Sequence, residues 1–255
     1  MILVLGGTGE ARGLAAALTG EGVAVTTSLA GRVMRPRLPA GEVRIGGFGG
    51  PEGLRRWLRA HRVAAVVDAT HPFAERISAS AAQACAEAGI PLLALCRPGW
   101  RQRPGDRWHR AADLHAAAGL VGELGHRVLL TTGRQGLGCF ATFAEPWFLI
   151  RCVDPPSCPL PPHHELRLDR GPYTLAGETA LFDEHRIDLL VTKDSGGKLT
   201  RAKLDVARSR SVPVIMVDRP PRPPVHTVHL VEEAASWALT QASGSSSPSS
   251  SRRSR

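Results

Sequence analysis

Short apolar runs alternate with alanine-rich amphipathic stretches along most of this 255-residue chain. Residues 2–5 and 63–67 are runs of the first kind, and residues 10–18 and 73–88 are stretches of the second. A short, continuously apolar run is typical of a strand that is buried on both faces, and strands that alternate with helices form parallel sheets. The pattern therefore predicts an α/β protein with Rossmann-like parallel sheets flanked by helices.

The alternation restarts in the second half of the chain. A helix predicted over residues 109–124 connects the first half to a new apolar strand at 127–131. We therefore predict two Rossmann-like domains, 1–122 and 123–240. Residues 241–255 are rich in Gly, Ser, Pro and Arg, a composition that predicts a disordered tail.

The net charge indicates an anionic partner. The formal charge is +9, and it falls to about +6 when the tail residues Arg252, Arg253 and Arg255 are set aside. Such a surplus fits a phosphate-bearing cofactor, a polycarboxylate, nucleic acid or a membrane surface. No apolar run approaches the ~18–20 residues of a spanning helix, and no aromatic-rich strand offers a stacking platform for bases. We expect neither a membrane nor nucleic acid as partner.

The cysteines and the first residues of the chain bear on its location. The five cysteines are scattered and include no C-x-x-C pair, which favours reduced thiols over a disulfide framework. Met1 leads directly into an apolar strand, with no basic segment or cleavage site of a signal peptide. We expect a cytoplasmic protein.

The first strand is followed by a glycine-rich turn, which contains Gly6, Gly7, Thr8, Gly9 and Glu10. Ligands of open parallel sheets bind where strands end, and glycines there let a pyrophosphate approach the backbone and the helix N-terminus. Counted from Gly7, the third glycine of G-x-G-x-x-G is replaced by Arg12. A flavodoxin-like turn without a nucleotide therefore stays an alternative.

The end of the second strand indicates which cofactor is used. An NAD site normally has an acid there for the ribose 2′-hydroxyl. Here the chain has no acid and offers Ser28 and Arg32 instead. A hydroxyl and a guanidinium suit a 2′-phosphate, so we expect NADPH, although Arg32 alone could be an ordinary surface arginine.

A third turn joins a buried strand to a long helix and contains Asp68, Thr70, His71 and Pro72. Polar side chains at the end of a buried strand are candidates for cofactor contact or proton transfer. Simple helix capping by Thr70 or His71, with Asp68 bonded to nearby backbone, is an equally good interpretation.

Two turns in the second half each combine hydroxyls, glycines and a cation, and they contain Thr132, Gly133, Arg134, Lys193, Asp194, Ser195 and Gly196. Such groups can form a cradle for an anion. Neither turn has P-loop spacing, so nucleotide hydrolysis is not indicated. Taken singly, each could be a solvated basic turn.

Other chemistries find little support. Cys158, His163 and His164 lack the spacing of metal ligands, so no metal site is predicted. The only tyrosine, Tyr173, is followed four residues later by Gly177, which excludes the Tyr-x-x-x-Lys pair of short-chain dehydrogenases.

Taken together, the turns resemble the precorrin-6A reductase family of cobalamin biosynthesis, which includes cobalt-precorrin-6A reductases. The matching strings include GGTGEARG (6–13), TSLAGR (27–32), DATHPFA (68–74), TKDSGG (192–197) and VPVIMVDRPP (212–221). The resemblance implies NADPH-dependent reduction of one double bond of precorrin-6A to give precorrin-6B. It also implies an active site in the inter-domain cleft, with cofactor on the first domain and tetrapyrrole on the second.

The resemblance carries roles to individual positions. The cofactor-binding residues would be Gly6, Gly7, Thr8, Gly9, Glu10, Ser28, Arg32 and Thr70. The substrate-binding residues would be Thr132, Gly133, Arg134, Lys193, Ser195 and Gly196, which suit a polycarboxylate. Candidates for proton transfer are Asp68, His71, Lys193 and Asp194. Other enzymes of the cobalamin pathway are candidate partners.

Two other classes of function compete with this interpretation. A non-catalytic regulator that senses NADPH would bind the cofactor without oxidising it. A nucleic-acid-binding protein would use the basic surplus and bind with a steep salt dependence. Both leave the paired turns of the second half unexplained.

Overall fold

The computed structural model describes residues 1–31 and 37–244, which form two compact units. One unit comprises Met1–Arg97 and the chain from Pro221 onward, and the other comprises Pro98–Pro220. Each is built on a six-stranded sheet in which every pair of neighbouring strands is parallel. The predicted α/β class is confirmed. No helix among the described residues has both the length and the apolar character to cross a membrane.

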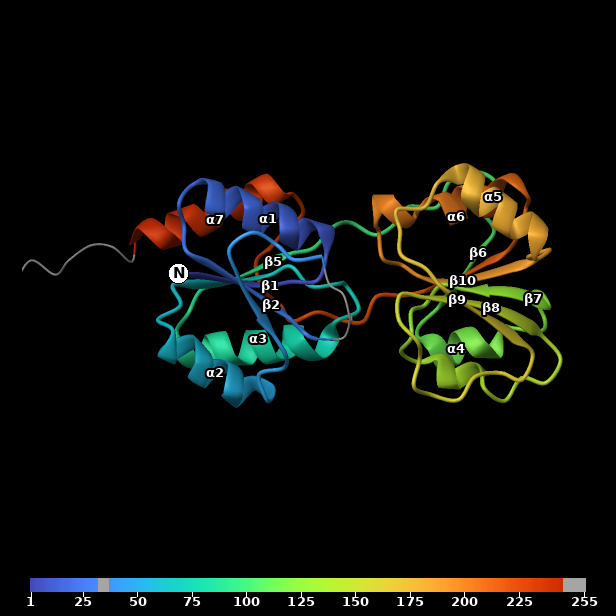
Figure 1. Ribbon diagram of the computed structural model, residues 1–255, viewed down its shortest axis with the longest axis horizontal. Helices are drawn as coiled ribbons and strands as arrows, with labels where there is room; N and C mark the ends of the chain where they lie inside the picture. Colours follow the sequence, from blue (N-terminus) through green and yellow to red (C-terminus); the bar gives the residue numbers. More distant parts are fainter. Residues whose placement is uncertain (32–36, 245–255) are drawn as a thin grey trace, which may run out of the picture. The chain divides into compact units, whose positions relative to one another are not determined.

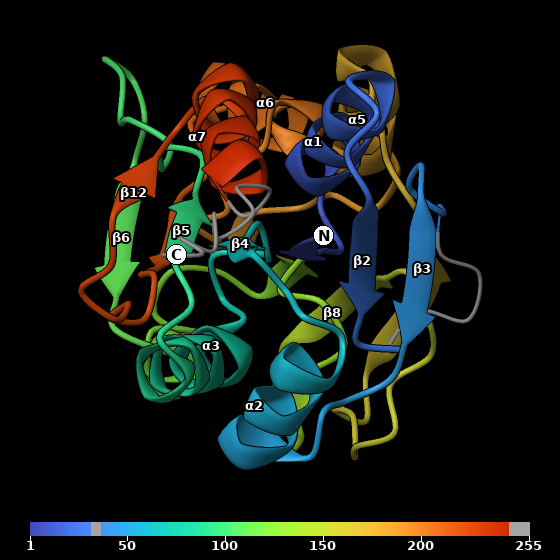
Figure 2. The same ribbon diagram turned by 90° about the vertical axis from the view of Figure 1, so that its left-hand side faces the viewer.

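The first unit contains β1 (Ile2–Leu5), α1 (Gly9–Gly20), β2 (Val25–Leu29), β3 (Glu42–Ile45), α2 (Gly50–Ala60), β4 (Ala65–Asp68), α3 (Glu75–Ala88), β5 (Leu92–Leu95), β12 (Thr227–Val228) and α7 (Val231–Gly244). Its strand order is β12-β5-β4-β1-β2-β3. Helices α1 and α7 cover one face of the sheet, and α2 and α3 cover the other (Figures 1 and 2).

The alternation of side chains along β1 shows how this sheet is buried. Ile2 and Val4 pack with α1 and α7, whereas Leu3 and Leu5 pack with α2 and α3. Successive side chains of a strand point to opposite faces, so a strand covered on both faces must be apolar throughout. This is why the runs that predicted strands are continuous.

The second unit contains β6 (Trp108–Ala111), α4 (Leu114–Gly119), β7 (Arg127–Leu130), the 3₁₀ turn η1 (Leu137–Phe140), β8 (Trp147–Cys152), β9 (His164–Leu168), α5 (Leu175–Glu184), β10 (Leu189–Lys193), the 3₁₀ turn η2 (Lys198–Thr200), α6 (Ala202–Ser209) and β11 (Val214–Val217). Its strand order is β6-β11-β10-β7-β8-β9. Helices α5 and α6 pack on one face, and α4 lies on the other (Figure 1).

Both sheets have the doubly wound order of a Rossmann fold, with the direction of winding reversing between β1 and β4 and between β7 and β10. In each sheet the strand at one edge is supplied by the other half of the chain. Strand β12 pairs with β5, with Thr227 opposite Ala94, and β6 pairs with β11, with Trp108 opposite Val214.

These two strands correct our division of the chain. We predicted domain boundaries at 122/123 and after residue 240. In the structure, the chain passes from the first unit to the second at 97/98 and returns at 220/221. The helix predicted over 109–124 is wrong: β6 occupies its start and only α4 is helical. Residues 241–244 of the predicted tail are the end of α7, and the rest of the tail lies outside the described residues. The predicted cleft between domains stays a prediction.

Candidate functional site

The first candidate site lies where β1 and β4 end side by side, at the reversal point of the first sheet. Leu5 is in register with Asp68 of β4 and with Ser28 of β2. The turn after β1 and the polar residues of β4 and β2 therefore meet at the carboxyl edge, which we define as the side of a sheet where its parallel strands end. Ligands of doubly wound sheets bind at this edge.

The turn after β1 depends on two glycines and one threonine. Gly7 has φ +113°, a conformation that favours glycine, and a Cβ on Gly6 would lie 2.6 Å from the Thr27 methyl group. Thr8 caps α1: its Oγ1 accepts from the Ala11 N–H (3.1 Å) and donates to the Ala69 carbonyl (2.8 Å). The N-terminus of α1 is thus held against the chain that leaves β4.

Glu10, in the first turn of α1, forms an ion pair with Arg97. The distance between its Oε2 and the guanidinium is 2.8 Å, and both side chains are largely buried. An unpaired acid at this position would repel a phosphate, so the arginine neutralises the one negative side chain in the first turn of α1. Arg97 was missed from the sequence because it lies far from Glu10 along the chain.

The end of β2 carries a cation that the sequence did not indicate. Arg44 of β3 donates to Ser28 Oγ (3.2 Å) and to the carbonyls of Gly46 and Gly47 (2.6 Å each). Burial lowers the pKa of its guanidinium. The acid of β3, Glu42, pairs with Thr26 at the other end of the strands. Arg32, our predicted cation, lies outside the described residues.

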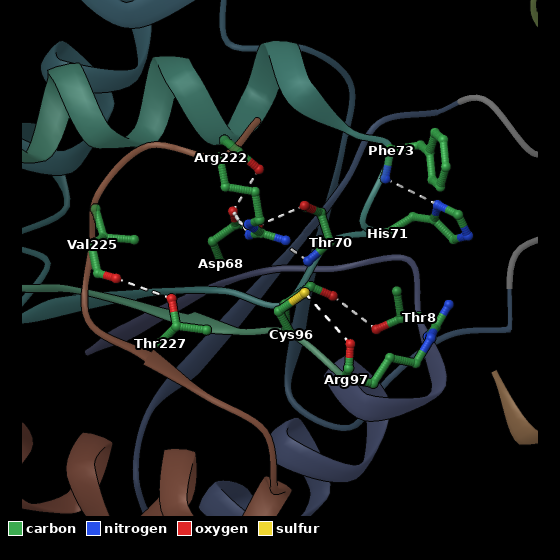
Figure 3. Close-up of polar contacts among 12 residues, drawn as sticks. Thr8, Asp68, Thr70, His71, Phe73, Cys96, Arg97, Arg222, Val225 and Thr227 are labelled. Carbon is green, nitrogen blue, oxygen red and sulfur yellow. Dashed lines mark hydrogen bonds and ion pairs between the residues drawn. The ribbon is translucent and has the colours of Figure 1, made fainter. Parts of the chain in front are cut away.

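Asp68 is buried, with 3% of its surface exposed. Its Oδ1 accepts from the N–H and hydroxyl of Thr70 (3.1 and 2.6 Å). Its Oδ2 accepts from Ser78 Oγ (2.6 Å). The same oxygen accepts from the Arg222 guanidinium (2.7 Å), which lies beside Asp68 in Figure 3. Each carboxylate oxygen therefore receives two hydrogen-bond donors, which hold the side chain in place as an anchoring group.

His71 is arranged differently. Its Nδ1 accepts from the Phe73 N–H (3.3 Å), and the ring is half-buried. In Figure 3 the rings of His71 and Phe73 lie to one side, away from the Asp68–Arg222 pair. Because Nδ1 is the acceptor, the neutral ring carries its proton on Nε2.

The second candidate site lies at the carboxyl edge of the other sheet, where β7 and β10 end. Thr131 follows β7 and donates its N–H to Val191 of β10 (3.0 Å). Thr132 is 4% exposed, and its hydroxyl has no hydrogen-bond partner among the described residues. Gly133 has φ +77°, and the half-buried Arg134 follows it.

Lys193 is the last residue of β10 and Asp194 follows it, and the two side chains have different environments. Lys193 is half-buried, and burial lowers the pKa of its ammonium group. Asp194 is buried: Oδ1 accepts from the Trp100 N–H (2.8 Å) and Oδ2 from Arg110 (3.2 Å). The Asp194 carbonyl also accepts from Arg219 Nε (2.7 Å).

The residues after Asp194 pack against the chain that enters this unit. Gly196 has φ +69°, and a Cβ there would lie 1.9 Å from the Pro98 carbonyl oxygen. A Cβ on Gly99 would lie 2.9 Å from the Asp194 carboxylate. Gly196 is thus required by close packing, whereas Ser195 makes a tight turn in which its N–H donates to the Lys193 carbonyl (2.7 Å).

The structure gathers the predicted residues into two groups, one at each carboxyl edge. Sequence reasoning missed the cations that complete them, which are Arg44, Arg97, Arg110, Arg219, Arg222 and Lys203. For Lys203 a signal existed, because a lysine stands among the apolar residues of the buried face of α6. For the arginines no local pattern marks the contact.

Two doubly wound sheets with polar turns at both reversal points define a protein of the Rossmann-like α/β class. The family model described as "Precorrin-6x reductase CbiJ/CobK" matches residues 1–239. The chain belongs to this family.

Individual relatives agree. The chain is 58% identical to a precorrin-6A reductase of Rhodococcus erythropolis, over 94% of this chain and 97% of that one. It is 54% identical to a precorrin-6A reductase of Mycobacterium tuberculosis (92% and 96%) and 30% identical to a cobalt-precorrin-6A reductase of Salmonella typhimurium (93% and 94%). A solved structure titled "CobK precorrin-6A reductase" superposes with a TM-score of 0.88 at 41% identity, covering 94% of this chain and 96% of that chain.

Proposed function

We propose that this chain reduces one carbon–carbon double bond of precorrin-6A with NADPH, giving precorrin-6B. The cofactor binds at the carboxyl edge of the first sheet and the tetrapyrrole at that of the second. The observation that carries the proposal is the similarity to precorrin-6A reductases over nearly the whole chain.

The residues of the first carboxyl edge fit a dinucleotide. The loop of Gly6, Gly7 and Thr8 leads into the N-terminus of α1, where free N–H groups and the helix dipole favour a pyrophosphate. Arg97 removes the repulsion that Glu10 would otherwise exert. Thr70 is a further candidate for contact with the cofactor. Its hydroxyl donates to Asp68, so towards the cofactor it can act only as a hydrogen-bond acceptor.

The end of β2 supports NADPH over NADH. The 2′-hydroxyl of NAD is normally bound by an acid at this place, whereas a 2′-phosphate needs a cation. Ser28 and Arg44 lie together here, and Glu42 is at the opposite end of the strands. Arg32 is a second candidate for the phosphate. We assign the 2′-phosphate to Ser28 and these arginines.

The second carboxyl edge suits the acetate and propionate arms of a tetrapyrrole. Arg134 and Lys193 supply positive charge, and the buried hydroxyl of Thr132 offers a donor. Charge-assisted hydrogen bonds to carboxylates are about twice as strong as neutral ones. Gly133, Ser195 and Gly196 shape the turns that carry these groups.

When bound, NADPH supplies the hydride. This chain must then hold the acceptor carbon in place, exclude water and provide a proton. Among the four candidates, His71 and Lys193 suit proton transfer best because both are half-buried, and burial makes the Lys193 ammonium a stronger acid. Asp68 and Asp194 are anchors, since all their carboxylate oxygens accept hydrogen bonds from fixed donors.

The metal-free macrocycle is the proposed substrate. The relatives more than half identical to this chain are named for precorrin-6A, whereas three relatives named for cobalt-precorrin-6A are 28–30% identical to it.

Turnover tests the proposal. The full chain is incubated with precorrin-6A and NADPH, while NADPH absorbance and the macrocycle spectrum are followed together. We expect both to change in equal molar amounts, faster than with cobalt-precorrin-6A. NADH should be at least roughly tenfold less efficient, as expected when charged hydrogen bonds are lost. NADPH binding without oxidation would contradict the proposal and favour a sensing regulator.

A further inference from the structure

Lys203 is a lysine in the interior of the second unit. It lies in the first turn of α6, between the helix and the sheet, with 5% of its surface exposed. Its neighbours Leu204, Val206 and Ala207 are core residues. Lysine is almost never fully buried unless it is paired, so the contacts of its ammonium group need an explanation.

The ammonium group of Lys203 points to the end of β7. Nζ donates to Thr131 Oγ1 at 2.9 Å, and the Trp100 ring centroid is 5.6 Å away. The other charged groups that face it are Arg151 of β8 and Glu178 of α5. Those two form a buried ion pair with each other, so the cluster has one positive charge in excess when Lys203 is protonated.

Thr131 connects this buried charge to the candidate substrate site. Its hydroxyl accepts from Lys203 and donates to the Val191 carbonyl of β10 (3.3 Å). It is half-exposed and directly precedes the turn of Thr132 and Arg134. One chain of hydrogen bonds thus links Lys203 to the residue that follows β7 and to the middle of β10.

We propose that Lys203 is a positioning residue of the substrate turn. It holds Thr131 from inside the unit, and its positive charge strengthens the binding of an anionic ligand at Thr132 and Arg134. This inference rests on the proposed function, which makes that ligand a polycarboxylate. Protonated Lys203 favours binding, so affinity for the tetrapyrrole falls as pH rises through the titration of this group.

Burial sets the pH range. It lowers the pKa of Lys203 to about 7, with a further decrease from Arg151 and an opposing increase from Glu178. A carboxylate bound at the turn stabilises the charged form, so binding is accompanied by proton uptake near neutral pH.

The test is KM for precorrin-6A between pH 6 and 8.5. For the wild type we expect KM to rise roughly fivefold over this range, the lower end of typical coupling between two sites. Lys203→Met should have a raised KM at pH 6 and a flatter profile. Thr131→Val should behave similarly and add little in the double variant, while Thr131→Ser should retain the wild-type profile. Lys198→Met, at an exposed lysine, is the matched control.

A wild-type profile in Lys203→Met, or additive effects of Lys203→Met and Thr131→Val, would overturn the inference. If the wild type does not turn over precorrin-6A, the proposed function fails instead. In that case the free energies of unfolding of the two single variants and the double variant test whether Lys203 positions Thr131. Non-additive values support the contact between Lys203 and Thr131 as a coupled unit, and additive values contradict it.

Discussion

Asp68 and Asp194 stand at corresponding places in the two sheets, where β4 and β10 end beside the reversal points. Asp68 accepts a hydrogen bond from Arg222, which lies just after the 220/221 boundary. Asp194 accepts a hydrogen bond from the N–H of Trp100, which lies just after the 97/98 boundary. Each carboxylate therefore fixes a segment of chain that returns to or enters its unit. Fixing these segments explains why acids are buried at the two positions, and it requires no role for them in proton transfer.

Asp68→Asn tests the anchoring role. Asparagine replaces one carboxylate oxygen with an NH₂ group, which is itself a donor. If this group takes the place of Oδ2, it faces the Ser78 hydroxyl and the Arg222 guanidinium, which now donate to that oxygen. We expect the free energy of unfolding to fall by roughly 2–3 kcal/mol, as for hydrogen bonds to a charged group. Ser78→Ala, which removes a single donor, should cost about 1 kcal/mol. Denaturant unfolding measures both. Unchanged stability together with lost turnover would return Asp68 to the catalytic candidates.

The residues that sequence reasoning found share a local signature, because each lies at the end of a buried strand or in the short polar segment that follows it. Those it missed act across long separations: Arg222 and Asp68 are 154 positions apart, and Arg97 and Glu10 are 87 apart. No spacing rule joins such pairs. The roles of the turns as cofactor and substrate sites stay predictions, whereas the anchoring of Asp68 and Asp194 required the fold.

At the scale of elements, the central strands were predictable because both faces of each sheet are covered. Strand β1 is apolar throughout, and β4, β7 and β10 have polar residues only at their ends, which are Asp68, Arg127, Thr192 and Lys193. Strands β6 and β12 were not predictable, since Trp108–Ala111 is only partly buried and Thr227–Val228 is very short. Their strand character comes from pairing with β11 and β5, which lie far away in the sequence.

The packing of Gly196 against Pro98 gives a prediction for the segment that enters the second unit. Gly196→Ala adds a methyl group 1.9 Å from a carbonyl oxygen, in addition to the strain of a positive φ. Gly133→Ala has the same kind of φ and nothing within 4 Å, so it is the matched control. We expect the control to lose roughly 1–2 kcal/mol of unfolding free energy and Gly196→Ala clearly more. Equal losses in thermal or denaturant unfolding would show that the contact is unimportant.

At the scale of the whole molecule, some of the cations behind the net charge of +9 lie at the two carboxyl edges. Arg97 and Arg222 are paired with acids at the first carboxyl edge, and Arg44 lies beside Ser28. Arg134 and Lys193 flank the second reversal point. Part of the positive charge thus lies at two edges suited to small anionic ligands, while Arg252, Arg253 and Arg255 belong to the last residues of the chain.

The central claim is that the two edges bind different ligands. Its most direct test is the pair of dissociation constants, for NADPH and for precorrin-6A, in Arg134→Ala, Lys193→Ala and Arg44→Ala, with Lys198→Ala as the exposed control. We predict that the first two variants weaken tetrapyrrole binding roughly tenfold and leave NADPH binding nearly unchanged. Arg44→Ala should do the reverse. Equal weakening of both ligands in every variant would contradict the claim.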